Sequence, residues 1–126
     1  MTDVTMTWDG DDGEVVNPPV EELVRRIRAL DGQRLTIVTL QSETGYFAVG
    51  GSAFDGLVVY ADLGDGDFWS VLSPVTSSTR TVTVVAGGQP GDYEERLVTT
   101  AEVAVSAATQ FLASGTLSGD AEWIKS

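Results

Sequence analysis

The sequence contains no cysteine and no histidine, and its single lysine is Lys125. Without cysteine the chain cannot form a disulfide, a thiolate–zinc site or a thiol nucleophile. Without histidine it lacks the commonest general base, the commonest transition-metal ligand and the usual base of a serine triad. Carboxylates, hydroxyls and six arginines remain, and a glycosidase-like pair of carboxylates is still open to such a composition.

Long apolar runs are also missing, since none approaches the roughly 20 residues that a membrane-spanning helix requires. The stretch from Met1 to Gly10 has no basic segment followed by an apolar one, so we expect no signal peptide. A cysteine-free chain fits a reducing compartment, and we expect a cytoplasmic protein. Neither Gly64–Gly66 nor Gly87–Gly88 belongs to a nucleotide-binding glycine pattern, so we expect no cofactor.

Basic residues are scarce, with 7 against 19 acidic residues, and the formal net charge is −12. A field of this sign repels nucleic acid and anionic membranes and attracts basic proteins. We therefore expect neither nucleic acid nor membrane as a partner. A plainer interpretation is that the charge keeps the protein soluble, and composition alone leaves both interpretations open.

The patterning predicts one globular α+β domain spanning residues 1–126, in which 42% of the residues are hydrophobic. Short β-branched and aromatic runs separated by Gly and Asp turns predict an antiparallel meander of about five or six strands. The candidate strands are residues 4–8, 35–40, 46–49, 57–61, 68–72 and 81–86. Residues 87–92 are expected to be a loop, 93–98 a short edge strand, and 122–124 a final strand or packing tail.

Two helices flank the meander and are expected to pack on it. The first has Asn17 as its N-cap, an apolar stripe at helical spacing, and a stop at Asp31–Gly32. The second is capped by Thr99 or Thr100 and ends at Gly115, where a left-handed glycine belongs. Helices before and after a run of strands are typical of the α+β class.

The acidic stretch 9–14 is similar in composition to a calcium loop. In an EF-hand that began at Asp9, however, the third ligand position would be Gly13 and the twelfth would be Val20. Neither residue supplies a side-chain ligand, so we expect a solvated turn and no metal.

The segment between Leu35 and Thr79 carries no lysine or arginine. Two of its hairpin turns carry carboxylates beside aromatic residues, with Phe68 and Trp69 on one side and Tyr60 on the other, and such a surface would suit a basic protein partner. The carboxylates of the segment are Glu43, Asp55, Asp62, Asp65 and Asp67. The alternative is that turns need Asp and Gly for backbone reasons and that the aromatics fill the core.

The order of motifs in the last two thirds of the chain resembles a known family. A strand ends in a Gly-Gly pair (Tyr46 to Gly51), a meander with an aspartate-rich turn follows, and a later strand ends in Gly87-Gly88-Gln89. The last motif is a helix ending A-A-x-x-F-L-x-x-G at Gly115, followed by Glu122-Trp123. Over residues 33 to 124 this order resembles the immunity proteins of bacterial polymorphic toxin systems, common in actinobacteria and often encoded beside deaminase-type toxins.

The resemblance implies a small non-enzymatic α+β protein that neutralises a cognate toxin by stoichiometric binding. Toxins that act on nucleic acid tend to be basic around the substrate channel, so an acidic protein could associate fast by electrostatic steering. The residues that we expect to bind the partner are Asp62, Asp65, Asp67 and Trp69, followed by Glu94 and Glu95. Phe111 and Trp123 are expected in the core.

Two other functions remain open. An adaptor or structural protein without a toxin partner would share the acidic surface. A small hydrolase could use a carboxylate pair among Asp62, Asp65 and Asp67, with one raised pKa in a cleft. Three acids in one exposed turn are poorly placed for catalysis, because solvent keeps their pKa values ordinary.

Overall fold

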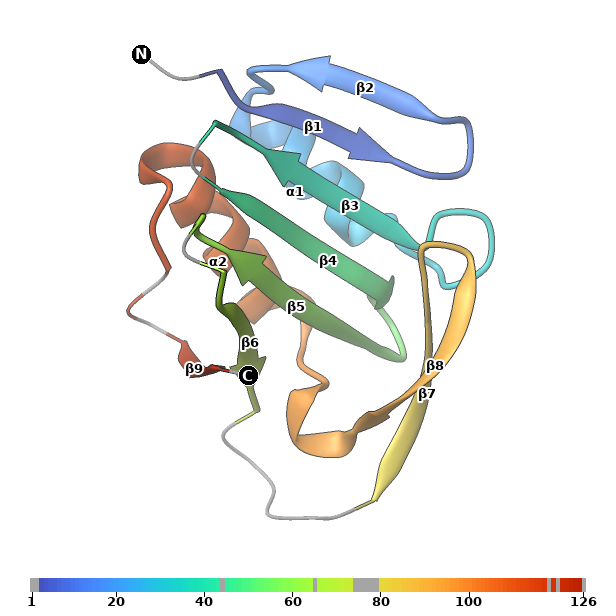
Figure 1. Cartoon of the computed structure of the whole chain (residues 1–126). Helices are drawn as coiled ribbons and strands as arrows, with labels where there is room; N and C mark the ends of the chain where they lie inside the picture. The colour runs from blue at the N-terminus through green and yellow to red at the C-terminus, as the bar shows by residue number, and fades with distance from the viewer. Residues whose placement is uncertain are drawn as a thin grey trace.

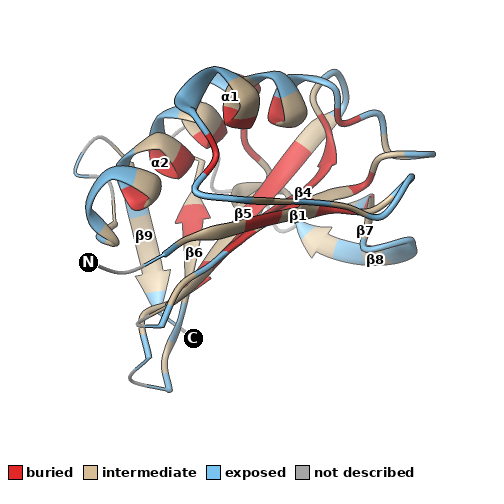
Figure 2. Cartoon of the chain, turned by 90° about the horizontal axis from the view of Figure 1, so that it is seen from above, coloured by how far each residue is buried: buried red, intermediate tan, exposed pale blue. Residues whose placement is uncertain are grey.

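The structure, a computed structural model, describes residues 3–43, 45–64, 66–73, 80–117, 119 and 121–125. Its largest element is a seven-stranded antiparallel sheet in the order β2-β1-β3-β4-β5-β6-β9, and a hairpin, β7–β8, forms a second sheet (Figure 1). Helices α1 and α2 lie on one face of the large sheet, and the hairpin lies on the other (Figure 2). The α+β class, with an N-terminal and a C-terminal helix on an antiparallel sheet, is confirmed.

The bounds of the elements are as follows. The large sheet consists of β1 (Thr5–Trp8), β2 (Gly13–Val16), β3 (Ile37–Gln41), β4 (Tyr46–Ser52), β5 (Gly56–Asp62), β6 (Phe68–Leu72) and β9 (Glu122–Lys125). The hairpin pairs β7 (Thr81–Ala86) with β8 (Gln89–Glu94), and the helices are α1 (Val20–Arg28), the short 3-10 helix η1 (Glu95–Leu97) and α2 (Ala101–Ser114).

The prediction that residues 81–86 complete the meander is wrong. Gly87 and Gly88 have φ angles of 65° and 79°, and two consecutive positive φ angles allow a two-residue hairpin turn. The chain therefore reverses at once, and residues 89–94, expected as a loop and the start of an edge strand, pair with β7 instead. The large sheet includes β2, whose first residues were expected to belong to a turn, and β9 at its other edge, where a final strand or packing tail was predicted.

The first helix begins and ends at residues other than those predicted. Asn17 is not its N-cap: it has a φ of 53°, and its side-chain oxygen accepts a hydrogen bond from the Val4 amide at 3.0 Å. The cap position is Pro19, and the helix ends at Arg28, one turn before Asp31. The Asp31 carboxylate instead accepts the amides of the next loop, from Gln33 to Leu35.

The second helix has the predicted caps. The Thr100 side chain accepts from the Val103 amide, and Gly115 takes the left-handed conformation with a φ of 71°. Its buried face consists of small residues and one ring, namely Ala101, Ala104, Ala107, Ala108 and Phe111. Phe111 stacks on Phe47 of β4 with ring centroids 5.3 Å apart. The small side chains let α2 approach the sheet closely.

The core fills the space between the helices and the sheet, where the buried residues gather in Figure 2. It includes Phe47, Phe111, Leu23, Ile27 and Leu40, each with 1% or less of its surface exposed. Trp123 is partly buried and packs against this core from β9. Neither of the two α-helices that the structure describes is long and apolar enough to cross a membrane.

Candidate partner-binding face

The two faces of the large sheet differ in chemistry. One face meets the helices and is apolar, with aliphatic side chains and the rings of Phe47 and Trp8. The other, here called the outer face, is polar and aromatic, and the strand register places one row of residues across all seven strands. The row is Glu14, Thr7, Thr39, Ala48, Tyr60, Ser70 and Ile124. Within this row, the hydroxyls of Thr7 and Thr39 on β1 and β3 hydrogen-bond to each other.

The hairpin covers only one end of the outer face. In β7 and β8, the residues that alternate toward the large sheet are Val82, Val84, Ala86, Gly91 and Tyr93. Ala86 and Val84 lie over Gly50 and Gly51 of β4. The Gly88 amide donates to the Thr36 hydroxyl at 2.8 Å, which attaches the tip of the hairpin to the residue just before β3. Gly50 and Gly51 were expected to end β4. The strand instead continues through Ser52, and the lack of side chains at the two glycines lets the hairpin approach it.

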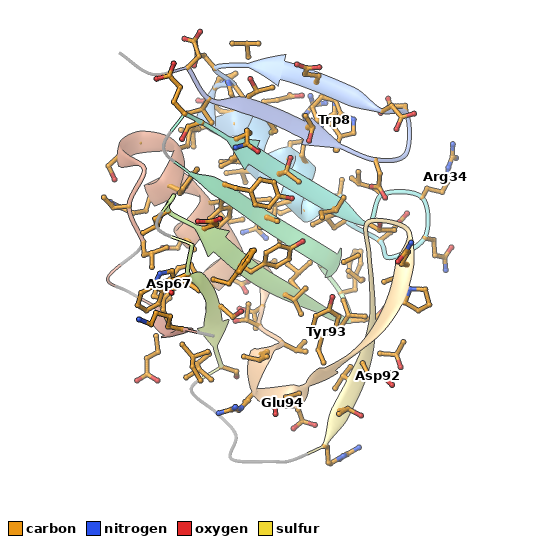
Figure 3. All side chains as sticks on the ribbon, in the orientation of Figure 1. Trp8, Arg34, Asp67, Asp92, Tyr93 and Glu94 are labelled. Carbon is orange, nitrogen blue, oxygen red and sulfur yellow. The ribbon has the colours of Figure 1, made fainter. Side chains whose placement is uncertain are left out.

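A tyrosine cluster, defined as Tyr46, Tyr60 and Tyr93, occupies the corner between the hairpin and the open part of the outer face. The rings of Tyr46 and Tyr60 are 6.3 Å apart on adjacent strands. Figure 3 shows Tyr93 on the side of the hairpin nearest β5, whereas Asp92 points away from it. Each of the three side chains is half-buried. They are the only three tyrosines in the sequence.

The tyrosine hydroxyls interact electrostatically. Burial raises the pKa of Tyr60 to about 12, and the neighbouring Tyr46 and Tyr93 add to the shift. Burial also raises the pKa of Tyr46, against a hydrogen bond with Tyr60 that lowers it. The phenols of Tyr46 and Tyr60 are therefore neutral at physiological pH, so they can donate hydrogen bonds as well as accept them.

The charges are distributed unevenly over the molecule. Strands β1 to β6 carry no lysine or arginine, and the one base of the large sheet, Lys125, lies 3.5 Å from the Asp67 carboxylate. Three of the arginines are on α1, behind the sheet. Two of these, Arg25 and Arg26, pair with Glu22, and Arg26 also covers the ring of Trp8 at 3.7 Å.

The structure places three of the predicted partner-binding residues around the β5–β6 turn. Asp62 lies on the outer face opposite Tyr46 and Phe68, and its carboxylate accepts from the Gly64 amide at 2.8 Å. Asp67 pairs with Lys125. Trp69 is half-buried, and its indole nitrogen is inaccessible and finds no hydrogen-bond partner among the residues that the structure describes. Asp65 lies outside the described residues.

Glu94 and Glu95 lie at the other end of β6. Glu94 is exposed and pairs with Arg96, and the Glu95 amide donates to the Arg80 carbonyl. The Ser73 amide, just after β6, donates to the Arg96 carbonyl at 2.6 Å. Asp67 and Glu94 are therefore separated by about the length of a five-residue strand, roughly 17 Å. Figure 3 shows the two apart, so the predicted acids flank the face rather than form one site.

The tyrosine cluster was missed as a unit from the sequence. Tyr60 was noted beside acidic turns, but Tyr46 and Tyr93 were not. The alternation of β4 and β5 contained the signal for Tyr46, because residues 46 and 60 are both on the outer face. Tyr93 could be added only if Gly87–Gly88 was interpreted as a hairpin turn.

The acidic stretch at the end of β1 serves structural purposes. Asp9 accepts hydrogen bonds from the amides of Thr36 and Ile37 and from the Thr36 hydroxyl. Asp11 accepts the Trp8 indole N–H at 2.6 Å. Within the described ranges, no three Asp or Glu side chains are arranged to hold a metal ion.

A second surface feature is a groove of about 630 Å³ beside the β4–β5 turn. The C-terminal end of α1, the first turn of α2 and the β4–β5 turn form its walls. Phe54, at the tip of that turn, is 89% exposed. The charged residues of the groove are of both signs: Arg28, Asp55 and Glu102.

In a comparison with known families, the family described as Immunity protein Imm1 matches residues 17–125, from the residue after β2 to the end of β9. No curated protein matches the chain.

Proposed function

Because the chain belongs to the Imm1 family of immunity proteins, we propose that it binds one cognate bacterial toxin and neutralises it stoichiometrically. The observation that carries this proposal is the family match, which includes every element from α1 to β9. The name of the family describes immunity, and immunity proteins act by occupying a toxin rather than by turnover.

The charge distribution supports a basic toxin as the partner. The net charge of −12 and the base-free strands β1 to β6 would attract a cationic surface and accelerate encounter. A toxin that acts on nucleic acid, such as a deaminase, would present such a surface along its substrate channel. Blocking that channel, or a neighbouring site that excludes substrate, would suffice for protection.

We keep the acidic residues beside the outer face as the proposed contacts. They are Asp62 and Asp67 at one end of β6 and Glu94 and Glu95 at the other. Asp65, which lies outside the described residues, stays a proposed contact from the sequence alone. Charges on both sides of a binding face steer association and fix orientation more than they add affinity. Trp69 alternates with Ser70 and therefore lies on the helix-facing side of β6, so a contact of Trp69 with the toxin would be made from the edge of the sheet and not from the outer face.

Action without catalysis is part of the proposal. Of the carboxylates considered for a hydrolase, Asp62 accepts a backbone amide of its own turn and Asp67 pairs with Lys125. Neither arrangement encloses a carboxyl in a cleft away from solvent, as a catalytic acid would require.

The test is co-expression with the toxin gene encoded next to this one. The toxin alone should arrest growth, and the chain should restore growth and co-purify in a one-to-one complex. Titrating purified toxin with the chain should reduce its activity linearly and abolish it at equimolar ratio, whereas an enzyme that inactivates the toxin would act at a small fraction of that amount. If the neighbouring product is harmless, or no complex survives purification, the proposal fails and an adaptor role takes its place.

A further inference from the structure

The tyrosine cluster has the features of a binding platform. All three tyrosines of the chain are brought together from β4, β5 and β8, while the aromatic rings of the core are Phe47, Phe111 and Trp8. The tyrosine rings are half-buried, so one part of each is held in place and another part faces solvent. Rigid, partly exposed tyrosines are enriched at protein interfaces, because they offer a large contact area at a small cost in conformational entropy.

The residues around the cluster leave room for a ligand. Its neighbours along the outer face are short polar side chains, Thr39 and Ser70, and the buried Ala48. The hairpin forms one wall, since Tyr93 faces the large sheet from β8. At the open end lies Asp62, directly across from Tyr46 and two residues from Tyr60 on the same face.

The negative charge beside the cluster favours a cationic group as its ligand. Asp62 is the nearest carboxylate along the strands, and its side chain is partly exposed. Strands β1 to β6 contribute no positive charge that would compete for it. Aromatic faces attract cations within about 6 Å of the ring centroid, and the planar guanidinium of arginine can stack on a ring while it pairs with a carboxylate.

We propose that the tyrosine cluster anchors an arginine-bearing segment of the toxin, whose guanidinium stacks on Tyr60 and Tyr46 and pairs with Asp62. This inference rests on the proposed function, because it names the part of the surface and the chemistry of the partner through which neutralisation would occur. The acids at the two ends of β6 steer the toxin, and the tyrosines hold it.

The groove beside Phe54 supports no proposal of its own. Its walls hold one arginine and two acids, so its charge selects no class of partner. Phe54 nevertheless makes a useful control, because it is an exposed aromatic residue at the tip of a turn away from the cluster.

The experiment measures binding of a catalytically inactivated toxin by calorimetry. Tyr60→Ala and Tyr46→Ala should each weaken affinity by at least about ten-fold, as truncation of interface anchors does. Asp62→Asn keeps the acceptor for the Gly64 amide and removes the charge, and it should weaken affinity several-fold. Tyr60→Phe retains the ring, so it should retain most of the affinity. Phe54→Ala should bind like the wild type.

Thermal unfolding of each variant separates lost binding from lost folding, and the conservative pair Tyr60→Phe and Asp62→Asn stays informative if an alanine variant does not fold. If the wild type binds toxin and the folded tyrosine variants bind within two-fold of it, the cluster is not the anchor and the proposed function stands. If Phe54→Ala abolishes binding instead, the interface is at the groove. If the wild type binds no toxin, both proposals fall. A dimer of the chain that Tyr60→Ala dissociates would assign the face to self-association and overturn the inference.

Discussion

The β-carbon of Ala86 lies directly over Gly50, so closely that a β-carbon added at Gly50 would stand 2.5 Å from it. Real side chains do not approach so closely, and glycine at position 50 is therefore what allows the hairpin to rest on β4. The same contact orients Tyr93, since β7 and β8 are paired in register and Tyr93 lies on the same face of the hairpin as Ala86. A glycine in the large sheet thus positions a residue of the proposed binding surface.

Gly50→Ala is expected to destabilise the fold by about 1–3 kcal/mol, because overpacking forces the hairpin to shift. The double variant Gly50→Ala/Ala86→Gly removes the clashing atom and should recover most of that loss, apart from the smaller cost of a glycine in β7. Urea unfolding of the two single variants and the double variant measures the coupling. Gly119→Ala is the control, since an added β-carbon there meets nothing within 4 Å. Additive effects of the two substitutions would contradict the close contact.

Asp9→Ala is expected to cost roughly 2–3 kcal/mol, because it leaves two backbone amides and a hydroxyl without their charged acceptor. The amide nitrogens of Thr36 and Ile37 lie 2.7 and 3.1 Å from Asp9 Oδ1. The Thr36 hydroxyl also accepts from Gly88, so the substitution should loosen the hairpin tip as well. Chemical denaturation and amide exchange at Gly88 measure the two effects.

The matched control for Asp9 is Glu14→Ala, which removes the same charge from an exposed position on the neighbouring strand. It should change the free energy of unfolding by no more than about 0.5 kcal/mol. Equal losses for the two variants would mean that charge, and not the hydrogen bonds of Asp9, is responsible.

Local signals in the sequence predicted much of the fold. The second helix was predicted from Thr100, Gly115 and the spacing between them, and the structure has both caps at these residues. The central strands follow from β-branched runs between Gly and Asp turns. These features depend on residues close together in the chain, where backbone preference and solvent exposure act directly.

Features that depend on contacts between distant segments were predicted poorly. Asn17 has the right chemistry for a helix cap, but its partner is Val4, in the segment just before β1. Gly50–Gly51 was interpreted as a strand end because glycine is a poor strand residue, and only the position of Ala86 explains why β4 continues through it. The tyrosine cluster is of the same kind, since its members meet only after β8 folds back.

The stability of the protein is expected to decrease as pH rises from about 10 to about 12. The pKa of Tyr60 is raised from 10.0 to about 12 in the folded protein, chiefly by burial. The folded state therefore holds this proton more tightly than the unfolded chain does. Its stabilising effect is complete below pH 10 and disappears as the pH passes through the folded pKa. Thermal unfolding over this range should give a steeper decline for the wild type than for Tyr60→Phe. Equal declines in stability for the two proteins would contradict the prediction, because they would mean that Tyr60 is not the group whose raised pKa links stability to pH.

The acids at the two ends of β6 should govern the rate of toxin association. Asp62→Asn and Glu94→Gln each remove one charge beside the outer face, and each should slow association by roughly two- to five-fold at low salt. The effect should shrink as salt screens the field, while the dissociation rate of Glu94→Gln stays close to that of the wild type. Stopped-flow binding at low and physiological ionic strength measures both rates.

Glu21→Gln is the matched control for these rates. It makes the same change in net charge from an exposed position on α1, behind the sheet. If the location of charge determines steering, Glu21→Gln should leave the association rate nearly unchanged, because the toxin approaches the other face. If all three variants slow association equally, only the net charge of −12 matters. In that case the acids around β6 would lose their assigned role, and the tyrosine cluster alone would have to define the binding face.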